Sequence, residues 1–156
     1  MEQVCPKLVL SAPDSYLDLG HKVKAMMHWV SDHLPGFDFL LKTDLDTLIC
    51  FHAVTDLLDA VQLRFRTSQR IYLGHFETCS KIRHNPHERF YDPAYQADIL
   101  LREDALCYPP YMQGLGYVLS RDLVQTIGAM WRSLNVYTNE DMSATRRGRN
   151  PGPQSS

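Results

Sequence analysis

The chain has 156 residues, of which 44% are hydrophobic, so it is long enough to bury one substantial core and too short for two comfortable domains. Its formal net charge of −2 provides no basic field, which argues against nonspecific binding to nucleic acid. The N-terminus lacks a signal-peptide pattern, and no apolar run reaches the roughly 18 residues of a membrane span. We therefore expect one soluble domain, or part of one.

The four cysteines, Cys5, Cys50, Cys79 and Cys107, are widely spaced and contain no Cys-x-x-Cys pair, so a structural zinc site is not expected. Four cysteines are compatible with two disulfides, and equally with small buried side chains. The cysteines by themselves thus leave the redox compartment open.

Strand and helix patterns alternate along the chain. Apolar runs bounded by Pro or Gly predict strands at 7–12, 37–41 and 71–76, the last of them broken by Gly74. Apolar residues at helical spacing predict amphipathic helices over 17–34, 54–65 and 122–134. Between Glu77 and Tyr95 no period is sustained, and we expect loops with short strands. This alternation indicates the α/β class.

Two prolines, two glycines and three tyrosines lie within residues 108–120. Such glycines allow the backbone to approach another group closely or to adopt positive φ; the simpler interpretation is a strained turn that leads into a strand. Ser120 can cap the helix that follows, and Asp122 suits the positive end of its dipole.

Asp44 and Asp46 follow the apolar run 37–41, so two carboxylates stand at the carboxyl end of a predicted buried strand. In an open α/β sheet this edge is where ligands bind. Hard carboxylate oxygens suit Mg²⁺ or Mn²⁺, which keep open positions for substrate phosphates. A turn or a helix cap is the alternative role for an Asp-x-Asp pair.

Further acidic residues, Glu140 and Asp141, come after Asn139, which could simply cap another helix. The last residues, 146–156, offer nothing apolar to pack, and we expect a disordered tail there.

Four sequence islands occur in an order that resembles glycosyltransferase family 31, the β-1,3-galactosyltransferases and β-1,3-N-acetylglucosaminyltransferases. The islands are the Asp-Ser-Tyr segment that begins at Asp14, Leu-Lys-Thr-Asp-Leu-Asp at 41–46, the Tyr-Pro-Pro-Tyr to Leu-Ser segment at 108–120, and Asn-Glu-Asp-Met at 139–142. The resemblance spans roughly Lys7 to Ser143. It implies a GT-A-type α/β fold with a mixed sheet flanked by helices.

The resemblance also implies a function: inverting, metal-dependent transfer of a hexose from a UDP-sugar to a hydroxyl of a glycan or glycoprotein, in a β-1,3 linkage. Asp46 would bind Mn²⁺, or Mg²⁺, directly, and Asp44 would face the nucleotide and the waters of the metal. Asp141 would be the catalytic base, with Glu140 as its second. A loop that carries Tyr111, Gly114 and Gly116 would line the sugar pocket.

Two positions depart from the family pattern, because Leu45 replaces the middle acid of an acidic triplet and Met112 stands where many relatives have Cys. The match also implies that only the central part of a catalytic domain is present, at 1–145. By family resemblance the protein would act on the lumenal side of the Golgi membrane, through a signal anchor that this chain does not contain.

Two other functions are compatible with parts of the sequence. Asp44 and Asp46 after a strand also resemble the motif of haloacid-dehalogenase-type phosphatases, but Thr47 falls one position too early. A truncated transferase-like domain that no longer holds the donor is the stronger alternative. Binding of a UDP-sugar with Mn²⁺ separates the catalytic interpretation from both of them.

Overall fold

The computed structural model of the protein describes residues 9, 15, 18–66, 69–88, 90–93 and 107–134. Its elements are, in chain order, α1 (Leu19–His33), β1 (Phe39–Thr43), α2 (Phe51–Phe65), β2 (Tyr72–Glu77), β3 (Tyr111–Ser120) and α4 (Arg121–Ala129). The helices and strands predicted between residues 17 and 134 are thus confirmed, with small shifts of their ends. The predicted strand at 7–12, apart from Val9, and the tail at 146–156 lie outside the described residues.

The three strands form a sheet in the order β1-β3-β2, and both neighbouring pairs are antiparallel. The expectation of a mixed sheet is therefore wrong for the part of the chain that is described. The alternation of strands and helices does leave β1 and β2 running in the same direction. However, β3 inserts between them, so each of them pairs with β3 instead of with the other.

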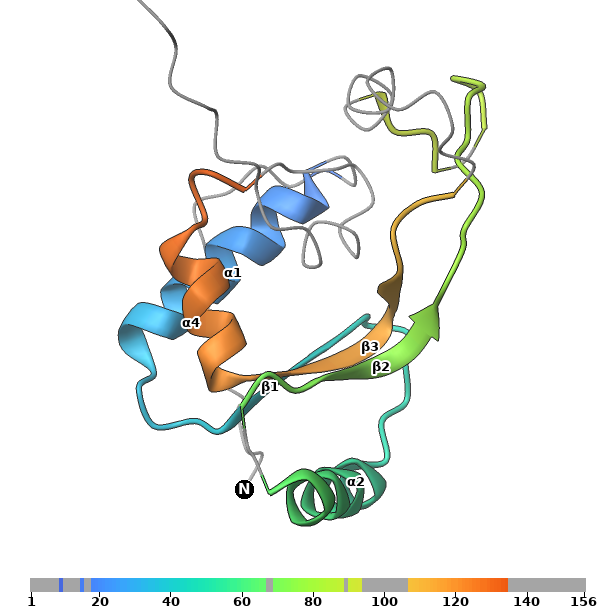
Figure 1. Ribbon diagram of the computed structural model, residues 1–156. Helices are drawn as coiled ribbons and strands as arrows, with labels where there is room; N and C mark the ends of the chain where they lie inside the picture. Colours follow the sequence, from blue (N-terminus) through green and yellow to red (C-terminus); the bar gives the residue numbers. More distant parts are fainter. Residues whose placement is uncertain are drawn as a thin grey trace, which may run out of the picture.

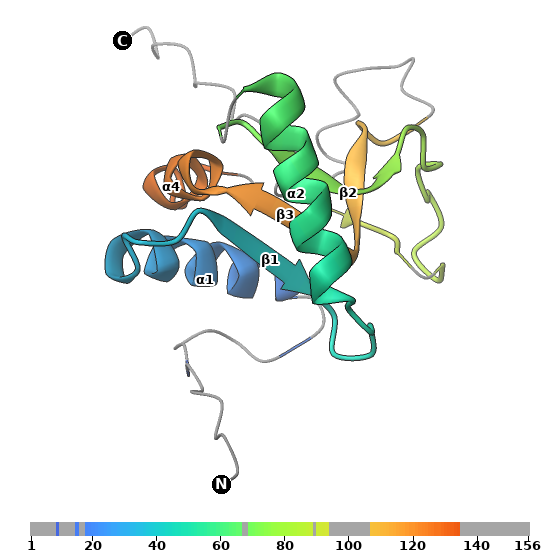
Figure 2. The same cartoon turned by 90° about the horizontal axis from the view of Figure 1, so that it is seen from below.

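The helices cover both faces of this sheet, with α1 and α4 on one face and α2 on the other (Figure 1). Seen from below, α2 crosses in front of the strands, while α1 and α4 lie to one side of it (Figure 2). Helices α1 and α4 pack closely because Gly128 has no side chain: a Cβ there would lie 2.9 Å from Cβ of Ser31. Among the described helices, none combines the length and apolarity that crossing a membrane requires.

The main core lies between the sheet and the pair α1 and α4. It consists of Val23, Met27, Val30, Tyr117, Leu119 and Val124. Because side chains alternate along a strand, Val118 points the other way and packs with Leu58 of α2 and Ile71. The strand predicted to be buried, β1, lies at an edge of the described sheet, so Phe39–Leu41 are only half-buried and Thr43 is exposed, and Lys42 alone in this strand is buried.

The pairing of β2 with β3 is interrupted by a large bulge in β3. Gly74 pairs with Tyr117 and Phe76 pairs with Met112, so two steps along β2 correspond to five along β3. The three extra residues lie within 113–116, which we call the bulge. Gly74 lies opposite it, where a side chain would be crowded, because a Cβ at Gly74 would lie 3.0 Å from the carbonyl oxygen of Gly116. Bulges of this kind re-aim backbone groups and are common beside active sites.

The expected loop over 111–116 is therefore the first part of β3. Tyr111 and Met112 pair with β2, and Gly116, at the end of the bulge, pairs with Thr43 of β1. No described glycine has a positive φ, so conformational freedom of that kind does not explain Gly114 and Gly116. The simpler interpretation, in which this glycine-rich stretch leads into a strand, is closer to what the structure shows.

The corner between β3 and α4 is built differently from the expected helix cap. Ser120 does occupy the N-cap position, but its hydroxyl makes no capping bond to the helix. Instead it accepts a hydrogen bond from the backbone N–H of Ile71 and donates one to Asp122. Asp122 stands in the first turn, as expected, and also accepts from the backbone N–H of Arg70. The corner thus ties β2 to the start of α4.

A disulfide joins Cys79, just after β2, to Cys107, shortly before β3. Beside it, Lys81 and Cys107 form an isolated antiparallel bridge, and the N–H of Tyr108 donates to the carbonyl of Ser80. Among the described cysteines, Cys50 is free and exposed, while Cys5 lies outside them. The chain therefore contains at least one disulfide, which closes the long connection between β2 and β3 at its base.

Candidate functional site

The two aspartates predicted to bind a metal stand where expected, at the carboxyl end of β1. The backbone turns here, because the N–H of Thr47 donates to the carbonyl of Asp44 over 3.2 Å. This turn, residues 44–47, lies at the tip of β1, on the path that leads to α2 (Figure 2). The side chain of Asp44 is 43% exposed, and Asp46 is also exposed. Both carboxylates are accessible to a ligand in solvent.

Lys42, the one buried residue of β1, reaches both the turn and the bulge. Its ammonium Nζ donates to Oδ1 of Asp44 over 2.8 Å and to the carbonyl of Gly114 over 3.1 Å. The same Nζ lies 5.6 Å from the centre of the Tyr117 ring, within range of a cation–π contact. Lys42 thus connects the predicted metal ligand Asp44 to the predicted pocket residue Gly114.

Thr43 makes a second connection between these segments. Its hydroxyl donates to the carbonyl of Leu115 over 3.1 Å, and in the strand register Thr43 stands opposite Gly116. A Cβ at Gly116 would make only ordinary contacts, the nearest at 3.6 Å to Ile49. The structure therefore brings Asp44, Gly114 and Gly116 together at the end of the sheet where β1 stops. It does not show that Gly116 must be glycine.

Tyr111 is the first residue of β3, where it pairs with Glu77 at the end of β2. Glu77 holds the bulge from this side, because its carboxylate accepts from the amide of Gln113 over 3.1 Å. Its other oxygen accepts from the N–H of Cys79 over 3.3 Å. Tyr111 is thus placed near the disulfide, five residues from Gly116, and is half-buried.

The carboxylate oxygens of Asp44 and Asp46 at the turn are suitable ligands for a hard divalent cation that keeps open coordination positions. In the described ranges, no group of three or more His, Cys, Asp or Glu side chains is arranged to hold a metal. One carboxylate oxygen of Asp44 already accepts a hydrogen bond from Lys42. The Asp46 carboxylate makes no hydrogen bond or ion pair within these ranges. Two carboxylates alone suit Mg²⁺ or Mn²⁺ whose remaining ligands are waters and phosphate oxygens.

The predicted base, Asp141, and its neighbour Glu140 lie outside the described residues. Their distance from the turn is therefore not part of the structure, and their proposed role stays a prediction from the sequence.

Sequence reasoning missed Lys42 and Glu77. A signal for Lys42 was present, because residues i and i+2 of a strand point to the same face, which places Lys42 beside Asp44. A lysine within the apolar run of β1 also needs a partner when it is buried. No comparable signal existed for Glu77, whose contact with Gln113 spans 36 positions in the sequence.

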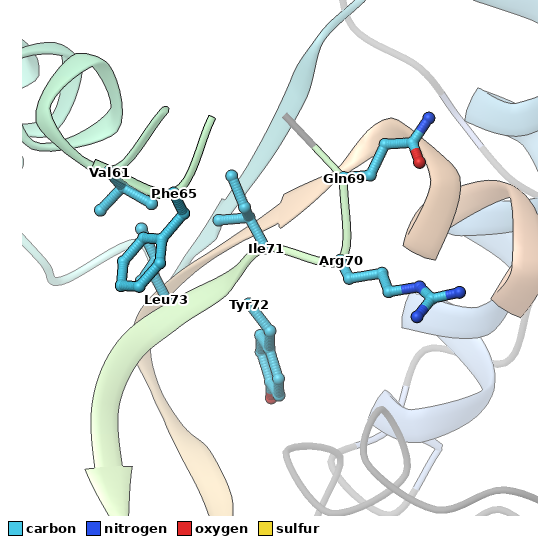
Figure 3. A pocket seen from close by; sticks show the side chains of 7 residues that line it. All are labelled: Val61, Phe65, Gln69, Arg70, Ile71, Tyr72 and Leu73. Carbon is cyan, nitrogen blue, oxygen red and sulfur yellow. The ribbon is translucent and has the colours of Figure 1, made fainter. Parts of the chain in front are cut away.

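A cavity of about 570 Å³ lies away from this site, between the end of α2 and the start of β2. Its lining side chains are Val61, Phe65, Gln69, Arg70, Ile71, Tyr72 and Leu73 (Figure 3). None of the predicted site residues is among them. The cavity is mostly apolar and its lining lacks a carboxylate, so it does not fit the metal chemistry of the turn.

Comparison with known proteins gives a family and several relatives. A model of the galactosyltransferase family matches residues 7–146. β-1,3-Galactosyltransferase 6 of Mus musculus is 33% identical over 132 residues, which cover 83% of this chain and 36% of that protein. UDP-GalNAc:β-1,3-N-acetylgalactosaminyltransferase 1 of Homo sapiens is 29% identical over 130 residues, with the same two coverages. The chain thus spans about a third of the length of these relatives.

Proposed function

Because the chain belongs to the galactosyltransferase family, we propose that it is the central part of a metal-dependent hexosyltransferase. The proposed reaction transfers galactose or an N-acetylhexosamine from a UDP-sugar to a hydroxyl of a glycan or glycoprotein, with inversion and a β-1,3 linkage. The observation that carries the proposal is the accessible pair Asp44 and Asp46 on a turn at the end of β1. Family membership leaves no support for the phosphatase alternative.

In this proposal the two aspartates have different tasks. Asp46 would hold the metal directly, since its exposed carboxylate makes no hydrogen bond or ion pair within the described residues. Asp44 would face the diphosphate and the waters around the metal, because one of its oxygens already accepts from Lys42. A bound Mn²⁺ or Mg²⁺ supplies positive charge that stabilises the departing UDP.

The bulge would form the wall of the sugar pocket. Lys42 and Thr43 hold its carbonyls against the end of β1, so a sugar attached to UDP at the turn would lie beside Gly114 and Gly116. Tyr111, at the start of β3, would offer an aromatic face to a sugar ring. These groups bind and orient the donor, and none of them needs to exchange a proton.

Transfer with inversion also needs a carboxylate on the acceptor side of the sugar. As the acceptor oxygen bonds to the anomeric carbon, the bond to UDP breaks and the hydroxyl proton passes to the base. Asp141 is the proposed base, with Glu140 as its second, on the strength of the family motif alone.

The disulfide supports a compartment for this activity. Cys79 and Cys107 are bonded, and disulfides persist in oxidising compartments, whereas cytosolic thiols are kept reduced. The lumen of the Golgi is such a compartment for glycan synthesis, and we place the proposed reaction there.

A binding experiment tests the proposal. Mn²⁺ is titrated calorimetrically into the protein with and without UDP, for wild type, Asp46→Asn and the control Asp59→Asn, whose exposed carboxylate lies on α2. We expect binding that requires UDP and that Asp46→Asn weakens by more than the roughly 10- to 100-fold attributed to outer-shell partners. Equal binding by all three proteins would refute the metal site. Absence of binding by the wild type would favour the non-catalytic alternative.

A further inference from the structure

The described part of the chain buries two lysines, Lys24 and Lys42, and they are satisfied in different ways. Lys24 donates to the carbonyl of Leu134 over 2.6 Å, and burial lowers the pKa of its ammonium. Lys42 is 9% exposed and is bonded to a carboxylate as well as to a carbonyl. A buried ammonium is costly unless it is paired and hydrogen-bonded, so the positions of both partners are coupled to that of Lys42.

The two partners belong to segments that are far apart in the sequence, since Lys42 and Gly114 are separated by 72 positions. Asp44 begins the turn that carries both aspartates, and Gly114 lies in the bulge, where β3 has lost its regular pairing with β2. A carbonyl that leaves a strand ladder takes its hydrogen bond from a side chain or from water. The Lys42 ammonium is that donor at Gly114, as the Thr43 hydroxyl is at Leu115.

We infer that Lys42 is a positioning residue for the donor site, because its ammonium clamps the Asp44 carboxylate and the Gly114 carbonyl into one fixed arrangement. This inference rests on the proposed function. The turn would hold the diphosphate and its metal, and the bulge would hold the sugar, so the distance between them decides whether one UDP-sugar fits both. Lys42 acts on that distance through Asp44 and Gly114 and does not itself touch the reacting atoms.

A purely electrostatic role for Lys42 would have the opposite sign. The ammonium is a positive charge beside the proposed cation site, and its removal would strengthen metal binding if charge repulsion were its main effect. Clamping predicts that removal weakens the binding of Mn²⁺ with UDP, because the Asp44 carboxylate is then no longer held in one position. The direction of the change in affinity therefore separates the two roles.

The test compares wild type, Lys42→Met and the matched control Lys24→Met, which also removes a buried ammonium but lies on α1. Amide hydrogen exchange without ligand is measured over residues 44–47 and 113–116, and binding of Mn²⁺ with UDP is measured by calorimetry. For Lys42→Met we expect at least roughly tenfold faster exchange in both segments and about tenfold weaker binding, which is the scale of an outer-shell partner. Lys24→Met should change neither segment nor the affinity.

A second variant guards against a folding defect in Lys42→Met. Asp44→Ala removes one partner of the clamp at an accessible position, and it should also accelerate exchange in the bulge, to which Lys42 connects it. Unchanged exchange over 113–116 in both variants, or tighter binding of Mn²⁺ with UDP by Lys42→Met, would overturn the inference. If the wild type binds no Mn²⁺ with UDP, the proposed function fails, and the exchange rates alone then decide whether Lys42 clamps the two segments.

Discussion

The hydroxyl of Ser120 donates a hydrogen bond of 2.6 Å to Oδ1 of Asp122, at the corner where β3 becomes α4. Burial by itself would raise the pKa of Asp122, but hydrogen bonds from Ser120 and from the backbone N–H groups of Arg70, Asp122 and Leu123 outweigh burial and lower the pKa. The ionised carboxylate is therefore a structural group that joins β2, β3 and α4.

This corner predicts a particular dependence of stability on pH. Because the pKa of Asp122 is lower in the folded protein, its contribution to stability is present above the unfolded pKa, about 3.9, and is lost as pH falls through the folded value. We expect Asp122→Asn to lower the melting temperature at about pH 7. Below about pH 4, the difference in melting temperature between Asp122→Asn and wild type should become smaller. Asp59→Asn serves as the exposed control. A gap of equal size at both pH values would contradict the prediction.

Asp141 is predicted to be the catalytic base. General-base assistance typically contributes about 10² to 10⁴ in rate, so Asp141→Asn should lower kcat by that order and leave the KM for the UDP-sugar nearly unchanged. Glu140→Gln should lower kcat less. The measurement is initial-rate kinetics of hexose transfer, with UDP-galactose and UDP-N-acetylhexosamines as donors. Near-full turnover by Asp141→Asn, or a loss caused only by weaker donor binding, would show that the base lies elsewhere.

Gly74 is predicted to be intolerant of a side chain. A Cβ would meet the carbonyl oxygen of Gly116 and Cβ of Tyr117, each at 3.0 Å, so Gly74→Ala should lower the free energy of unfolding by roughly 1–3 kcal/mol, as overpacking does. Gly36→Ala is the matched control, since a Cβ at Gly36 would have nothing within 4 Å and its φ is not positive. Urea unfolding of both variants measures the difference. Equal stabilities would show that the bulge can move away from β2.

The disulfide is predicted to contribute substantially to stability. It joins cysteines 28 positions apart, and replacing both Cys79 and Cys107 by Ser should cost about 2–4 kcal/mol of unfolding free energy. Cys50→Ser removes an exposed free thiol and should change the unfolding free energy by less than about 0.5 kcal/mol. A reducing agent should destabilise the wild type and Cys50→Ser alike, and should leave the double variant unaffected. A wild type insensitive to reduction would contradict this account.

The amino-acid sequence by itself was sufficient for the local elements and for the family. The period of apolar residues placed α1 and α2, because each helix must bury one face, and Pro35-Gly36 ended α1 where the pattern stopped. The Asp-x-Asp pair was correctly placed at the end of a strand, because the apolar run and the following turn are both local signals. The family match over residues 7–146 confirmed the resemblance inferred from short motifs.

Only the tertiary structure decided how these elements meet. β3 inserts between β1 and β2 and makes the described sheet antiparallel, which depends on pairing between distant strands. The hydrogen bond from Lys42 to Gly114 likewise joins residues 72 positions apart. The same holds for the bulge opposite Gly74 and for the choice of Cys107 as the partner of Cys79. Such contacts follow from packing between distant segments and leave no periodic signal, so the link from Lys42 to both halves of the candidate site became visible only in the fold.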